Sequence, residues 1–105
     1  MNKQISVTEA AKFQDDETVV FLDVREGFEL DICKIENSLH IPLSEIPTRY
    51  DLLPKDKTIL VLCHHGRRSQ QAQEFLLAKG FDNAINMEGG IRAWAAQVDP
   101  QMQIY

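Results

Sequence analysis

The segment TILVLCHHGRRS, at residues 58–69, contains the clearest indication of the fold of this chain. Its first five residues are apolar or β-branched, a pattern typical of a strand that is buried on both faces of a parallel sheet. Cys63 follows the run, Gly66 comes three residues later, and a helix-like pattern begins at Arg68. The succession of strand, short loop and helix predicts an α/β protein, in which reactive groups lie at the carboxyl ends of the strands.

The loop after this strand has the composition of an anion site beside a thiol. A cysteine reacts as its thiolate, so its surroundings must favour negative charge. Arg67 and Arg68 are positively charged, Gly66 permits a tight loop with inward N–H groups, and a helix N-terminus follows. Residues 57–73 contain no acidic side chain. Alternatively, Cys63 only fills the core and the arginines begin a solvated helix. The strand before the cysteine, the two arginines and the helix after them together disfavour this alternative.

Strand and helix patterns alternate along the rest of the chain. Further strands are expected at residues 3–6, 18–22, 38–41 and 83–86, and helices at residues 6–13, 26–32, 44–53, 68–79 and after Gly89-Gly90. Ser44 is predicted to cap the third of these helices, and Gly80 to end the fourth. The alternation predicts a central parallel sheet with helices on both faces, in a single domain over residues 1–105.

Four segments also occur in the order and spacing of a known protein family. They are FLDVRE with the following Glu29, the segment at residues 35–42, the loop at residues 63–69, and MEGGIRAW at residues 87–94. Together they resemble the single-domain form of the rhodanese (thiosulfate sulfurtransferase) family, and so imply the rhodanese-like fold. The second segment departs most, because Cys33-Lys34 stands where the family usually has Gly-His.

The resemblance implies an enzyme that carries sulfur on Cys63. The thiol would attack an anionic sulfane donor such as thiosulfate, become a persulfide, and pass its outer sulfur to a thiol or to cyanide, without a cofactor. Arg68 matches the position that binds the donor's oxygens, and Arg67 is a second candidate. Backbone N–H groups would stabilise the thiolate and persulfide; they belong to the loop residues His64, His65, Gly66, Arg67 and Arg68.

Three residues are expected to support this site. Asp23 and Arg25 could line its mouth, but the resemblance suggests a structural role, with Arg25 paired to Glu29 across a helical turn. Ser69 either caps the following helix or donates a hydrogen bond to the sulfur, and the sequence leaves both open.

The two histidines and the second cysteine carry weaker expectations. The rings of His64 and His65 are expected to point outward, so that these residues contribute only their backbone N–H groups to the loop. Cys33 is expected to fill a small position in the core rather than to act as a second thiol. The consecutive Cys63-His64-His65 has the wrong spacing for a tetrahedral zinc site, so no metal is expected.

Two other functions compete with sulfur transfer. Fold-related phosphatases and arsenate reductases have one more residue between the cysteine and the closing arginine, whereas Arg68 is the fifth residue after Cys63. The chain could also be a docking or regulatory module for a sulfur-carrier protein. The intact Cys63, Arg67 and Arg68 favour the enzyme, because a pure docking module does not need them.

Composition narrows the class of partners. The net charge of −5 argues against general binding to nucleic acid or to a membrane surface. The first residues contain no long apolar stretch, and no run reaches the length of a membrane span, so neither a signal peptide nor a membrane segment is expected. A reducing cytoplasm is the expected compartment, since thiols stay free there.

Overall fold

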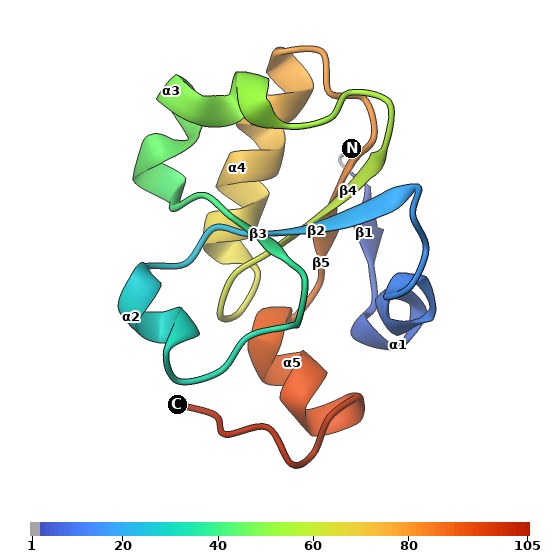
Figure 1. The fold of residues 1–105 in the computed structure, drawn as a ribbon, viewed down its shortest axis with the longest axis vertical. Coiled ribbons are helices and arrows are strands. Elements are labelled where there is room, and N and C mark those ends of the chain that lie inside the picture. Colours follow the sequence, from blue (N-terminus) through green and yellow to red (C-terminus); the bar gives the residue numbers. More distant parts are fainter. Residues whose placement is uncertain (1–2) are drawn as a thin grey trace.

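Five parallel strands form one sheet in the computed structural model, which describes residues 3–105. The strands are β1 (Gln4–Ile5), β2 (Val19–Asp23), β3 (Leu39–His40), β4 (Thr58–Leu62) and β5 (Ala84–Met87). Their spatial order is β1-β5-β4-β2-β3, which puts β4 in the centre of the sheet (Figure 1). The predicted parallel sheet is confirmed, and β4 has the predicted bounds. Residues 1 and 2 of the predicted domain lie outside the described residues.

Helices cover both faces of this sheet, as predicted (Figure 1). The α-helices are α1 (Val7–Ala10), α2 (Gly27–Leu30), α3 (Ile46–Arg49), α4 (Arg67–Ala78) and α5 (Gly90–Gln97), with 3₁₀ turns at Ala11–Phe13, Leu43–Glu45 and Tyr50–Leu52. Alternate residues of β4 point to opposite faces. Ile59 and Val61 pack in a core with α3 and α4, while Leu60 and Leu62 pack in a second core with α1 and α5.

Local sequence signals explain most helix ends. Gly80 ends α4 with a φ of 91°, and the Phe81 N–H binds the Leu76 carbonyl at 3.0 Å. The predicted cap at Ser44 is wrong, because the turn begins one residue earlier, and Ser44 lies inside the 3₁₀ turn. In that turn the Glu45 N–H already binds the Pro42 carbonyl at 2.8 Å.

Residues 98–105 follow α5, and no structure was predicted for them from the sequence. Figure 1 places the end of the chain near α2, and its last side chain joins the polar cluster described below. None of the helices described within residues 3–105 is long and apolar enough to cross a membrane.

Candidate active site

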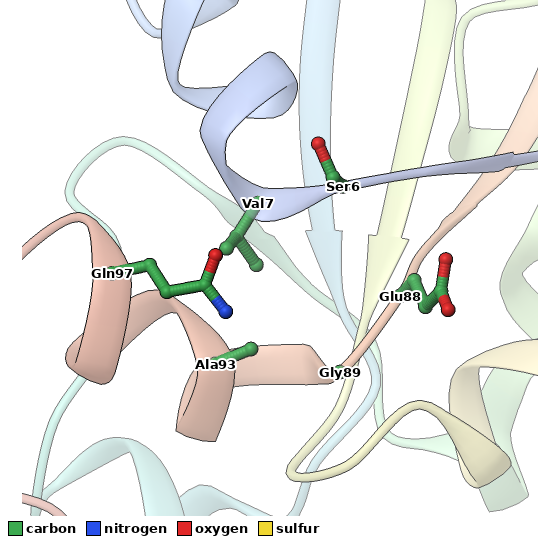
Figure 2. Close-up of a pocket in the computed structure, with 6 residues that line it drawn as sticks. All are labelled: Ser6, Val7, Glu88, Gly89, Ala93 and Gln97. Atoms are coloured by element: carbon green, nitrogen blue, oxygen red, sulfur yellow. The ribbon is translucent and has the colours of Figure 1, made fainter.

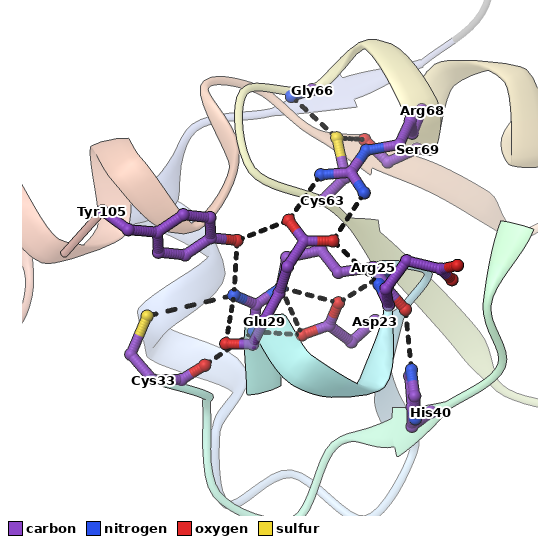
Figure 3. A network of polar contacts seen from close by, with 11 residues as sticks. Asp23, Arg25, Glu29, Cys33, His40, Cys63, Gly66, Arg68, Ser69 and Tyr105 are labelled. Carbon is purple, nitrogen blue, oxygen red and sulfur yellow. Dashed lines mark hydrogen bonds and ion pairs between the residues drawn. The ribbon is translucent and has the colours of Figure 1, made fainter. Parts of the chain in front are cut away.

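Cys63 lies directly after the central strand and is 1% exposed. Two groups approach its sulfur from the loop and from the first turn of α4 (Figure 3). The Gly66 N–H donates to Sγ at 3.0 Å, and the Ser69 hydroxyl lies 3.4 Å from it. Gly66 has a φ of 112°, a left-handed conformation that favours glycine and turns this N–H toward the sulfur. Donors aimed at one sulfur stabilise negative charge there.

Ser69 therefore faces the sulfur rather than capping the helix. It is fully buried, and its Oγ also lies 2.5 Å from Oδ1 of Asn86 on β5. A hydroxyl has one proton, so rotation can direct it either to Asn86 or to a thiolate. Asn86 also donates from Nδ2 to the Gly66 carbonyl at 3.2 Å. Sequence reasoning missed Asn86, and the only local signal was a polar residue inside an otherwise apolar strand.

The N-terminus of α5 holds the other side of the loop. The Ile91 N–H binds the Cys63 carbonyl at 2.8 Å, and the Arg92 N–H binds the His64 carbonyl at 3.1 Å. These contacts bring the backbone of Gly90 against the loop. A Cβ atom on Gly90 would lie 2.5 Å from both the Cys63 and the His64 carbonyl oxygens, and the φ of this glycine is 63°.

Gly90→Ala is expected to lower the free energy of unfolding by about 1–3 kcal/mol, because alanine adds left-handed strain and meets the loop backbone. Urea denaturation measures the loss, and the rate of Cys63 alkylation reports whether the loop moves. Gly27→Ala is the matched control, since a Cβ there meets nothing within 4 Å. Equal stability of the two variants would contradict the close approach.

Arg68 does not stand free at the end of the loop. Its Nη1 and Nη2 make a two-pronged ion pair with Glu29 of α2, at 2.7 and 2.8 Å (Figure 3). The Glu29 carboxylate also accepts the Glu26 N–H at 2.8 Å and the Tyr105 hydroxyl at 2.7 Å. The Arg68 hydrogen bonds lower the pKa of Glu29 to about 2, and the Glu26 and Tyr105 donors act in the same direction against burial. The fold thus brings an acidic side chain to a loop that has none in its own segment.

The predicted pair between Arg25 and Glu29 is wrong. Pairing across a helical turn requires both residues to be helical, but α2 begins at Gly27, two residues after Arg25. Arg25 is instead fully buried and binds Asp23 through Nη2 and Nε, at 2.7 and 3.0 Å. From Glu29 it reaches only the backbone carbonyl, at 3.4 Å, and it also donates to the Cys33 carbonyl at 2.8 Å.

The histidines of the loop differ from each other. His65 is exposed, as expected. The His64 ring does not point outward: it stacks on Tyr105 with centroids 4.2 Å apart, and its Nε2 donates to the Tyr105 carbonyl at 2.9 Å. Burial and the neighbouring His65 lower the pKa of His64, which favours the neutral ring.

Tyr105 connects the loop to the charged cluster, and sequence reasoning gave no sign of it. Its hydroxyl accepts from Nη1 of Arg25 at 2.9 Å and donates to Glu29. Burial raises its pKa to about 12, so the phenol keeps the proton that it donates. Its ring and carbonyl meanwhile hold His64.

Two hollows are lined by residues of the site, and a third lies apart from it. Arg67 is exposed and, with His65 and Gly66, lines a cavity of about 250 Å³; Arg68 lines another of about 280 Å³. A third lies between α1 and α5 (Figure 2) and includes no residue predicted for the site. Cys63 lines none of the three.

Cys33 is a buried free thiol in the core cluster opposite to that of Cys63, consistent with a core-filling role. In the part of the chain that the structure describes, no three His, Cys, Asp or Glu side chains gather in a way that could hold a metal ion.

Comparison with known proteins links this geometry to a family. The model of the rhodanese-like domain matches residues 6–97. The chain is 34% identical over 95 residues to a sulfurtransferase of Allochromatium vinosum, covering 90% of this chain and 89% of that protein. It is 36% identical over 88 residues to a Bacillus subtilis protein provisionally named sulfur carrier protein YrkF, covering 84% of this chain and 48% of the relative. The crystal structure of a rhodanese-related protein from Thermoplasma volcanium superposes with a TM-score of 0.84 and 38% identity, over 91% of this chain and 93% of that one.

Proposed function

The chain belongs to the rhodanese-like domain family, and we propose that it is a sulfurtransferase that carries sulfur as a persulfide on Cys63. The observation that carries the proposal is the Gly66 N–H, which points at Cys63 Sγ from 3.0 Å in a loop clamped by α5. Such a donor stabilises the Cys63 thiolate, which is the attacking group when the persulfide forms and the leaving group when it breaks. Relatives named for sulfur transfer add support.

The first half-reaction loads the cysteine. The Cys63 thiolate attacks the outer sulfur of a sulfane donor, a new S–S bond forms, and the donor's S–S bond breaks. With thiosulfate the leaving group is sulfite, which departs with the electron pair. Sulfur is transferred without an external oxidant, so the step needs no cofactor.

The second half-reaction unloads it. A nucleophile, either a thiolate or cyanide, attacks the outer sulfur of the persulfide, and the Cys63 thiolate leaves with the electron pair. Donor and acceptor react in turn with the same sulfur, which predicts ping-pong kinetics. The acceptor we propose is a low-mass thiol or the terminus of a sulfur-carrier protein, in a reducing cytoplasm.

Several groups assist in this scheme. Stabilisation of the charged sulfur is assigned to the loop N–H groups of His64, His65, Gly66, Arg67 and Arg68, and that of Gly66 lies 3.0 Å from Sγ. Arg68 orients the donor from the end of the loop, and Arg67 attracts anions from its exposed position. Asp23 and Arg25 act as structural support, and Ser69 offers its proton to the thiolate. We propose that residues 1–105 act as one domain in this reaction.

Intact-protein mass spectrometry tests the proposal. The wild-type protein and Cys33→Ser are incubated with thiosulfate or with the persulfide of N-acetylcysteamine, then with cyanide. We expect both proteins to gain the mass of one sulfur atom and to lose it to cyanide as thiocyanate. If neither donor adds sulfur while Cys63 remains free for alkylation, the proposal is overturned.

A further inference from the structure

The guanidinium that would bind the donor is already paired inside the protein. Both terminal nitrogens of Arg68 bind Glu29; the Glu29 side chain is only 7% exposed, whereas that of Arg68 is 35% exposed. This partly buried, two-pronged pair is held by geometry as well as by charge. A donor therefore meets an arginine whose positive charge is balanced before the donor arrives.

Glu29 is not free to move aside. Its two oxygens accept four hydrogen bonds, two from Arg68, one from the Glu26 N–H and one from the Tyr105 hydroxyl. The tyrosine is itself fixed by a hydrogen bond from Arg25 (Figure 3). Its ring also stacks on that of His64. Displacing the carboxylate would leave several donors without an acceptor inside the protein, which is unfavourable.

The charges at the site decide between classes of donor. Attack on thiosulfate assembles the thiolate, a dianion and the Glu29 carboxylate around the single positive charge of Arg68, while Arg67 is exposed to solvent. Attack on a persulfide of a neutral thiol brings at most one negative charge. Like charges at short range in a partly buried site repel strongly, so the dianion is the disfavoured substrate.

We infer that Glu29 is a specificity-determining residue, whose carboxylate neutralises Arg68 and directs the site toward persulfide donors and away from dianionic thiosulfate. The inference rests on the proposed function. The Cys63 thiolate attacks the outer sulfur of R–S–SH, the new S–S bond forms on Cys63, and R–S⁻ leaves with the electron pair. The arriving proton stays on the outer sulfur or passes to the leaving thiolate.

Glu29→Gln tests the inference, because glutamine keeps the size of the side chain, removes the charge, and retains one oxygen that can accept from Arg68 and Tyr105. We expect kcat/KM for thiosulfate to rise about tenfold, mostly because KM falls. For N-acetylcysteamine persulfide, kcat/KM should stay within about twofold of the wild-type value. Asp31→Asn is the matched control, since it removes one negative charge from an exposed position just after α2.

A second measurement does not depend on sulfur transfer. The rates at which anionic iodoacetate and neutral iodoacetamide alkylate Cys63 are compared, with the modified peptide identified by mass. Glu29→Gln should raise the ratio of iodoacetate to iodoacetamide rates severalfold, and Asp31→Asn should leave it unchanged. If Glu29→Gln melts early, Tyr105→Phe, which removes one donor to Glu29, should shift the ratio in the same direction by less.

The outcomes separate the two claims. If the wild-type protein accepts sulfur from neither donor, the proposed function fails, and the alkylation ratio still tests the role of Glu29. If Glu29→Gln changes both donors equally, or leaves the alkylation ratio unchanged, Glu29 has a structural role only and the inference is overturned.

Discussion

Cys63→Ser is expected to abolish persulfide formation and to lower turnover with any sulfane donor by at least about a thousandfold. Serine fits the site, because the Gly66 N–H and Ser69 can bind an oxygen where they now bind sulfur. A hydroxyl, however, is scarcely ionised at neutral pH and forms no stable bond to a transferable sulfur. The loss should therefore appear in the chemistry while the fold is retained.

Thiocyanate production from cyanide measures turnover, and the protein mass after incubation with donor measures loading. Cys33→Ser is the matched control, because it removes the other free thiol, which packs in the opposite core cluster. Melting curves of the two variants establish that both are folded. Turnover of Cys63→Ser within tenfold of the wild-type value would place the reactive group elsewhere.

The sequence predicted the part of this site that is local in the chain. The strand, the cysteine after it, the glycine loop and the following helix all lie within residues 58–78, and their pattern predicted both the fold and the position of Cys63. The parallel sheet was predicted from the alternation of strands and helices along the chain, because strands that alternate with helices form parallel sheets.

The polar contacts around the loop could not be predicted in the same way. Arg68 and Glu29 are 39 positions apart, and Tyr105 and Glu29 are 76 apart, so that only the folded chain brings them together. Ser44 and Arg25 show a second cause of error. Ser44 was expected to cap a helix, but the turn begins at Leu43; Arg25 was expected to pair with Glu29 across a helical turn, but α2 begins only at Gly27.

The buried pair of Asp23 and Arg25 leads to the largest expected effect on stability. Both side chains are 0% exposed, and they are joined at 2.7 Å between Oδ2 and Nη2. Arg25→Met should lower the free energy of unfolding by about 3–5 kcal/mol, because it leaves the Asp23 carboxylate buried without its counter-charge. Urea denaturation with an unchanged m-value would measure this loss.

Removing both charges should harm the protein less than the single changes suggest. In Asp23→Leu with Arg25→Met no charge is left unpaired, so the loss should be smaller than the sum of the two single losses, and a double-mutant cycle measures the difference. Additive losses would mean that the two charges are already solvated in the folded protein. Arg25 also donates to the Tyr105 hydroxyl, which in turn donates to Glu29. The Arg25→Met variant should therefore loosen the hold on Arg68 as well, so that stability at the end of β2 and the electrostatics of the cysteine loop depend on the same buried arginine.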